Sequence, residues 1–194
     1  MKKEHPTFIG VGVPKAGTTW LHYRFKHHPD IYTPVHKELH YFSRSPGKYP
    51  HLVSRLGEDS VTNRLYGNSE GAKAWRQYFE SFLDSYTQNN EEFNFTKLRR
   101  YFNYLFGDYS QDWYKSLFQN AVNRISGEFT PAYAALKRKD IDAIKDFLPD
   151  VKIILLLRNP IDRIWSHLRS AYSRKQIGIT QVPVDRLIDN LGRA

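Results

Sequence analysis

The feature that most constrains the fold is the segment of residues 151–157, VKIILLL, in which six of the seven residues are apolar. A run of this kind predicts a strand covered on both faces, as in a parallel sheet. Asn159 and Pro160 follow it and predict a helix N-cap with a proline at the first helical position. A stripe of apolar residues then predicts a helix, and it consists of Ile161, Ile164, Trp165, Leu168 and Tyr172.

The alternation of strands and helices extends along the chain. Apolar and β-branched runs predict strands at residues 7–13, 31–33 and 124–130. Helical spacing predicts helices from Thr18 to about residue 28, over 139–147, and in the aromatic-rich segments 75–86, 95–106 and 113–118. Residues 44–70 are rich in Gly, Pro, Ser and Asn and predict a loop. The pattern indicates a single domain with an α/β fold, in which a mainly parallel sheet lies between two helical layers.

Charge and composition narrow the classes of partner. The formal net charge is +9, which favours an anionic partner. The basic residues are spread along the chain, which argues against nucleic acid or a membrane surface and favours localised anion sites. The absence of cysteine excludes disulfides, thiolate catalysis and Cys-based zinc sites. No apolar run approaches the roughly 20 residues of a membrane span, and no signal peptide precedes the first strand. We therefore expect a cytoplasmic protein.

A first candidate anion site lies between the predicted strand 7–13 and the helix that follows it. Lys15 supplies a cation, Gly17 lets the backbone approach a ligand, and Thr18 and Thr19 add hydroxyl donors at the helix start, where the helix dipole favours anions. Gly12 and Gly17 have the spacing of a nucleotide-triphosphate P-loop, but Thr18 occupies the position of its lysine. No strand ends in an Asp that could hold Mg²⁺, so we expect no metal, and an atypical P-loop kinase remains as an alternative.

The segment P-K-x-G-T-T-W-L closely resembles the 5′-phosphosulfate loop of sulfotransferases that use 3′-phosphoadenosine 5′-phosphosulfate (PAPS). The resemblance implies a P-loop-like loop in which Lys15, Ala16, Gly17, Thr18 and Thr19 hold the 5′-phosphosulfate of PAPS as co-substrate. In the cytosolic branch of the family the next Trp stacks on adenine, which implies that role for Trp20. The alternative for Trp20 is packing in the helix core.

A second family signature is an Arg at the end of a later strand and a Ser eight residues on, which together hold the 3′-phosphate. Arg158 and Ser166 match it, and Arg158 follows the predicted strand 151–157 at its carboxyl end, where ligands of parallel sheets collect. A guanidinium group also suits bidentate phosphate binding. In isolation such a stretch is usually a capped helix with solvated arginines, and we expect Arg163 in this motif to be structural.

Residues 36–42, HKELHYF, resemble the K-E-x-x-[FY]-F motif of the heparan sulfate sulfotransferase branch, whose Glu is the general base. The resemblance implies that Glu38 is the base and that Lys15 neutralises charge on the bridging oxygen. Because the cytosolic branch uses a His, His40 and His36 are reserve candidates. The alternative for Glu38 is an ordinary surface charge.

Residues 127–133, GEFTPAY, resemble the E-K-[ST]-P-x-Y segment of the same branch, with Phe129 in place of its catalytic Lys. This departure argues against a heparan-like acceptor, whereas bacterial relatives that read G-E-x-T-P-x-Y fit better. Family members also continue with a helix, a strand and a basic Gly-containing loop that are not found before Ala194, so the resemblance implies a C-terminally short domain.

Residues 44–120 correspond to the variable, mostly helical part of the family on the acceptor side. Their aromatic residues suit a small-molecule, lipid or glycan acceptor, although most of them are expected to pack between helices and sheet. A chain without the C-terminal elements could also be a non-catalytic relative that binds 3′-phosphoadenosine 5′-phosphate (PAP), another nucleotide or a glycan.

Overall fold

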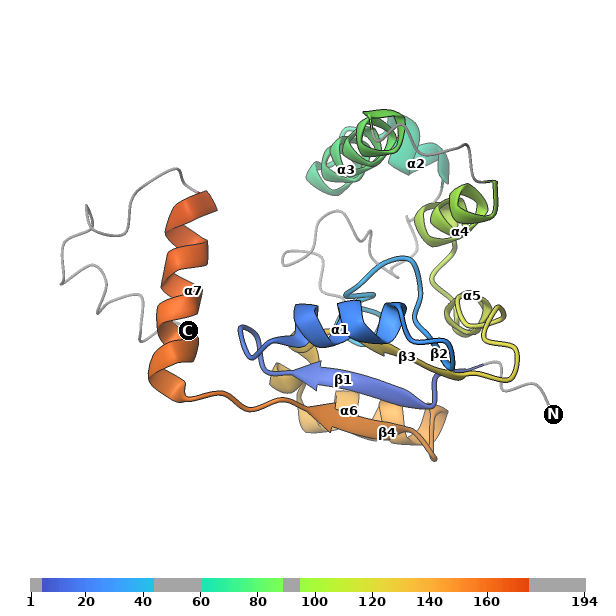
Figure 1. The fold of residues 1–194 in the computed structure, drawn as a ribbon. Coiled ribbons are helices and arrows are strands. Elements are labelled where there is room, and N and C mark those ends of the chain that lie inside the picture. The colour runs from blue at the N-terminus through green and yellow to red at the C-terminus, as the bar shows by residue number, and fades with distance from the viewer. Residues whose placement is uncertain (1–4, 44–60, 89–94, 175–194) are drawn as a thin grey trace.

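The computed structural model describes residues 5–43, 61–88 and 95–174, and Figure 1 shows their arrangement. Four parallel strands form the centre of the fold in the order β2-β3-β1-β4. They are β1 (Phe8–Gly12), β2 (Ile31–Tyr32), β3 (Ile125–Phe129) and β4 (Lys152–Leu155). Each predicted strand is therefore present, although β4 ends two residues earlier than the apolar run.

Helices cover both faces of the sheet. Helix α1 (Thr18–Lys26) lies on one face and α6 (Arg138–Phe147) on the other, which confirms the predicted three-layer α/β fold. A short 3₁₀ helix, Pro131–Ala135, joins β3 to α6. Helix α7 (Pro160–Arg174) stands apart, beyond the carboxyl ends of the strands (Figure 1).

The middle of the chain forms a helical region beside the sheet. It contains α2 (Val61–Tyr66), α3 (Glu70–Gln88), α4 (Phe95–Phe106) and α5 (Gln111–Ser116). Three of these helices match the predicted aromatic-rich helices. Helix α2 shows that the predicted loop over 44–70 is wrong at residues 61–66. Arg64 in this helix is buried and donates hydrogen bonds to the carbonyl oxygens of Leu105 and Gly107, which hold the segment in place. The rest of that predicted loop, residues 44–60, lies outside the described residues.

The main core joins the sheet to this helical region and is rich in aromatic side chains. Its largest fully buried members include Trp75, Tyr114 and Phe118. Close ring packing, such as the stacking of Tyr41 on Tyr114 with centroids 4.3 Å apart, adds to the apolar burial. Packing between helices and sheet thus accounts for much of the high aromatic content.

The prediction that residues 151–157 form a strand covered on both faces is wrong. Strand β4 is the edge strand of the described sheet, and its side chains Ile153 and Leu155 are 55% and 52% exposed. The composition of residues 151–157 shows that the run is apolar, but it does not show which strands and helices pack against it. The stripe on α7 is likewise only partly covered, because Leu168 and Tyr172 are buried whereas Ile161 and Trp165 are exposed.

Candidate functional site

The loop between β1 and α1 is fixed by its backbone. The amide of Val13 donates to the carbonyl oxygen of Leu156, and the amide of Leu156 donates to that of Gly12, so the loop continues the pairing of β1 with β4. Gly17 occupies the N-cap position of α1 with φ of 98°, in the left-handed region that favours glycine. No described atom lies within 4 Å of where its Cβ would be. The space beside Gly17 is therefore open at the N-terminus of α1, where unpaired backbone amides favour an anion.

The end of β4 meets this loop directly. The Arg158 guanidinium donates a hydrogen bond of 3.2 Å to the carbonyl oxygen of Lys15, which itself has a left-handed φ of 68°. The structure thus brings together the two predicted anion sites, although 143 residues separate them in the chain. Both lie at the carboxyl edge of the sheet, where ligands of parallel sheets bind.

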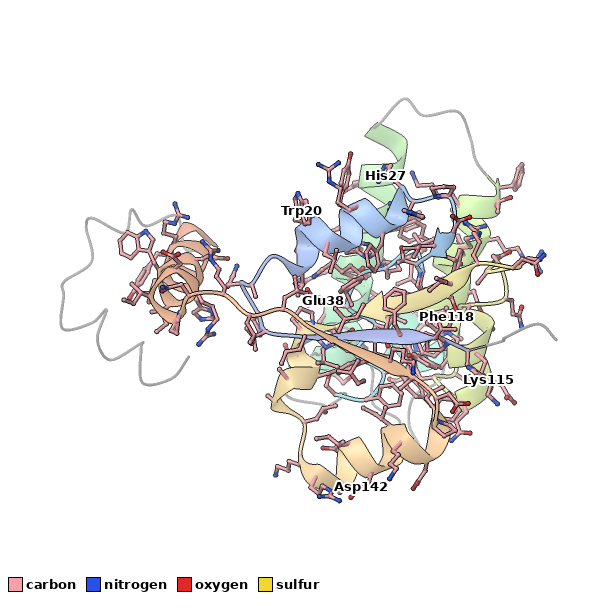
Figure 2. The ribbon with its side chains drawn as sticks, turned by 60° about the horizontal axis from the view of Figure 1, so that its bottom comes forward. Trp20, His27, Glu38, Lys115, Phe118 and Asp142 are labelled. Carbon is pink, nitrogen blue, oxygen red and sulfur yellow. The ribbon has the colours of Figure 1, made fainter. Side chains whose placement is uncertain are left out.

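Ser166 and Trp20 are placed differently. Ser166 lies half-buried on α7, about two turns beyond Arg158, and its side-chain hydroxyl makes no hydrogen bond to another described residue. Trp20 projects from α1 on the side away from the sheet (Figure 2) and is 61% exposed, with the Arg24 guanidinium 5.3 Å from its ring centroid. Packing of Trp20 in the helix core is therefore wrong.

The predicted base Glu38 lies at the end of β3, under α1 (Figure 2). Its amide donates to the carbonyl oxygen of Phe129 at 2.9 Å. One carboxylate oxygen is bound by the Lys37 ammonium group, and the other lies 3.6 Å from His40 Nε2. Glu38 and the reserve base His40 therefore form one cluster with Lys37, in which the Glu38 side chain is 39% exposed.

The charge state of Glu38 follows from this cluster. The interaction with His40, followed by that with Lys37, lowers the pKa of Glu38 from 4.5 to about 2, although burial opposes the change. The carboxylate is therefore ionised at neutral pH and can accept a proton. Glu38 and His40 also have left-handed φ values of 66° and 52°, which are uncommon for residues other than glycine.

Comparisons with known proteins identify the family of this chain. The family model for the sulfotransferase family matches residues 6–192. The chain belongs to the sulfotransferase family. A solved sulfotransferase from Alicyclobacillus acidocaldarius is 24% identical, with a TM-score of 0.49, and the match covers 90% of this chain and 53% of that one. The chain thus spans about half the length of that sulfotransferase. No curated protein matches it.

His36, the other reserve base, lies in an aromatic cluster of this sulfotransferase domain. Its ring stacks on Tyr104 with centroids 3.9 Å apart, and its Nδ1 lies 2.9 Å from the Tyr78 hydroxyl. The cluster borders a cavity of about 250 Å³, lined by His36, Tyr78, Ser81, Phe82 and Tyr101. His36 therefore faces helices α3 and α4.

The segment GEFTPAY has a structural role in this sulfotransferase fold. The Phe129 ring packs under α1 against Phe8 and Phe25, with centroids 5.6 and 5.5 Å away, so the residue in place of the family's Lys belongs to the core. Glu128 is 1% exposed and accepts hydrogen bonds from three hydroxyl groups. Glu128 lies within the family resemblance at residues 127–133, which implied no role for it.

His22 is a further residue near the site that sequence analysis missed. It lies on α1, buried against Phe129, and its Nδ1 has no hydrogen-bond partner among the described residues. Burial, followed by the charges of Lys37 and Lys26, lowers the pKa of His22 to about 4, while Glu38 opposes the change. His22 follows Thr18 by four residues, and this helical spacing could have predicted that both lie on the sheet side of α1.

Two general findings concern the described part of the chain. None of its helices is long and apolar enough to cross a bilayer. Within residues 5–43, 61–88 and 95–174, no three or more His, Cys, Asp or Glu side chains converge in a geometry that could hold a metal ion.

Proposed function

We propose that this protein transfers a sulfuryl group from PAPS to a hydroxyl or amine acceptor. The observation that carries the proposal is the contact between Arg158 and the backbone of Lys15. It joins a loop suited to a phosphosulfate to an arginine suited to a second phosphate, as a ligand with anionic groups at both its 5′ and 3′ positions requires.

Several features support binding of the 5′-phosphosulfate by residues 15–19. Gly17 leaves open space beside the start of α1, and Thr18 and Thr19 stand in the first helical turn. Lys15 would neutralise the charge that develops on the bridging oxygen as its bond to sulfur breaks. Arg158 would hold the 3′-phosphate, with Ser166 on α7 as its proposed partner, and the exposed ring of Trp20 is available to the adenine.

Glu38 is the proposed general base. In the transfer, the acceptor oxygen or nitrogen forms a bond to sulfur while the bond from sulfur to the phosphate oxygen breaks, which leaves PAP. Glu38 would take the acceptor's proton, and His40 is adjacent to share or relay it. Lys37 would hold the carboxylate in place before the acceptor arrives.

The cavity beside His36 is the proposed acceptor site. Since two residues span at most about 7 Å, the backbone at His36 lies within reach of that at Glu38. The lining residues are aromatic or carry hydroxyl groups, together with the His36 imidazole, and the volume of about 250 Å³ suits one small ring. A neutral phenol, sugar or alcohol therefore fits better than a long acidic glycan.

The low pKa of Glu38 favours a second candidate, a non-catalytic relative that binds PAP. General bases work best with a pKa near the working pH, and about 2 is far below it. The kinase alternative is not retained, because the chain belongs to the sulfotransferase family.

Thermal unfolding with PAP, or with ATP with and without Mg²⁺, tests the nucleotide site. We expect PAP to stabilise the fold by about 2.7 kcal/mol at 100 times its Kd, and ATP to stabilise it much less. Equal stabilisation by both would contradict the proposal. Turnover of PAPS with a panel of phenols, sugars, aminosugars and lipid alcohols then separates the enzyme from the binding protein.

A further inference from the structure

Glu128 is the centre of a buried polar network that contacts the segment carrying Glu38 and His40. The Tyr114 hydroxyl donates to its Oε1 at 2.7 Å, and the Tyr133 hydroxyl donates to the same oxygen at 3.2 Å. The Thr130 hydroxyl donates to Oε2 at 2.7 Å. All four side chains are at most 4% exposed, so the network is isolated from solvent.

Two of these hydroxyl groups also contact the segment that carries Glu38. Thr130 Oγ1 accepts the backbone N–H of His40, and the Tyr133 oxygen accepts that of Phe42, each at 3.4 Å. With the bond from Glu38 to the Phe129 carbonyl oxygen, alternate residues of the segment are tied to the end of β3 and the turn that follows. The two 3.4 Å contacts are long, so they depend on well-oriented acceptors.

Glu128 provides that orientation. A hydroxyl group has one proton, and Thr130 and Tyr133 each direct it to Glu128, which leaves their lone pairs for the backbone amides. Burial and the neighbouring Glu128 raise the pKa of Tyr133 well above its usual value, so this hydroxyl keeps its proton. Burial also raises the pKa of Glu128, while hydrogen bonds from the hydroxyl groups oppose that rise.

The segment needs this support because its backbone is strained. Glu38 and His40 both have left-handed φ values, and such residues persist where the surrounding structure holds them. The same backbone turns bring the Glu38 carboxylate to His40.

We infer that Glu128 is a positioning residue, which orients the Thr130 and Tyr133 hydroxyl groups so that they fix the backbone of residues 38–42 and hold Glu38 against His40. The effect of Glu128 on turnover rests on the proposed function, whereas its effect on the backbone of residues 38–42 does not.

Three substitutions test the inference. Glu128→Gln keeps the shape of the side chain but replaces one acceptor oxygen with a donor group. Thr130→Val removes a single hydroxyl and nearly preserves volume, so it carries the test if Glu128→Gln does not fold. Tyr114→Phe is the matched control, because it also removes a hydrogen bond to Glu128 and keeps the ring that stacks on Tyr41. Among the described residues, the Tyr114 hydroxyl makes no hydrogen bond to the 38–42 backbone.

The first readout is amide hydrogen exchange of the PAP-free protein. We expect exchange at His40 to become about 3- to 10-fold faster in Thr130→Val, the range for the loss of one hydrogen bond. Glu128→Gln should accelerate both His40 and Phe42, and Tyr114→Phe should accelerate neither. The second readout is an NMR titration of the Glu38 carboxyl, whose pKa should rise from about 2 toward 4.5 in Glu128→Gln and Thr130→Val alone.

The third readout is turnover, where kcat should fall by up to about 100-fold in Glu128→Gln with little change in PAP affinity, as expected for a displaced catalytic group. Equal changes at His40 and Glu38 in Tyr114→Phe, or no change in Thr130→Val, would overturn the inference. If the wild type transfers no sulfuryl group while the exchange and titration results hold, the proposed function fails and the positioning role stands.

Discussion

The Arg158 side chain donates a hydrogen bond to the backbone carbonyl oxygen of Lys15, which joins the end of β4 to the loop after β1. The contact places two cationic residues at the carboxyl edge of the sheet. Their positive charges suit a ligand that carries two separate anionic groups. This relationship makes the nucleotide site testable residue by residue.

Arg158→Ala should weaken PAP binding by about 1.5–3 kcal/mol, the loss expected for a hydrogen bond to a charged group. This corresponds to about 10- to 150-fold in Kd, measured by calorimetry. Affinity for adenosine 5′-phosphate, which has no 3′-phosphate, should change much less. Lys152→Ala is the control, since it removes the same charge from the opposite end of β4. If the substitution weakened binding of PAP and of adenosine 5′-phosphate equally, Arg158 would have a structural role and would not bind the 3′-phosphate.

Glu38→Gln should lower kcat by about 10²- to 10⁴-fold and leave PAP affinity unchanged, because proton removal matters in the transition state and not in binding of the co-substrate. His40→Asn is the comparison, assayed with the same acceptor. Normal turnover in Glu38→Gln together with an inactive His40→Asn would move the base to His40. Full activity in both would leave neither residue as the base.

Acid should destabilise the fold through His22. The pKa of His22 falls from 6.5 to about 4 on folding, so the unfolded chain binds the proton more readily. Stability is therefore greatest above pH 6.5 and should fall by up to about 3 kcal/mol as the pH drops toward 4. Urea unfolding across this range measures the slope, which His22→Leu should flatten and His27→Asn, at the exposed end of α1, should not. An unchanged slope in His22→Leu would assign the loss to other groups.

Glycine substitutions should separate core packing from the ligand loop. A Cβ at Gly10 would overlap the Phe129 ring, so Gly10→Ala should destabilise the fold by about 1–3 kcal/mol. In Gly17→Ala the added methyl group meets no described atom, so the substitution should lower the stability of the fold by about 1–2 kcal/mol through the left-handed backbone alone. Thermal unfolding measures both, and PAP affinity should fall mainly in Gly17→Ala. A larger loss of stability in Gly17→Ala than in Gly10→Ala would contradict this assignment.

Local pattern predicted much of the fold. The strands follow from apolar runs, and helical spacing predicted α1, α3, α4, α5, α6 and α7. The Asn159 side chain accepts the amide of Ile161 at 2.9 Å, as the predicted N-cap requires. Helix α2 was not predicted, because the short segment 61–66 has no apolar stripe. It is held by the buried Arg64, which donates a hydrogen bond to the distant Leu105 carbonyl oxygen.

By itself, the sequence determined the α/β fold, because strand, turn and helix signals depend on near neighbours. Its motifs also indicated the sulfotransferase family, and the residues of the nucleotide site stay a prediction. Only the tertiary structure decided that β4 lies at the sheet edge, that Arg158 reaches Lys15, and that the Glu38 carboxylate contacts His40 and Lys37. It also revealed the hydroxyl groups around Glu128. The physical reason is that burial, pKa shifts and hydrogen bonds between distant residues depend on the register and packing of the sheet, which no local pattern specifies.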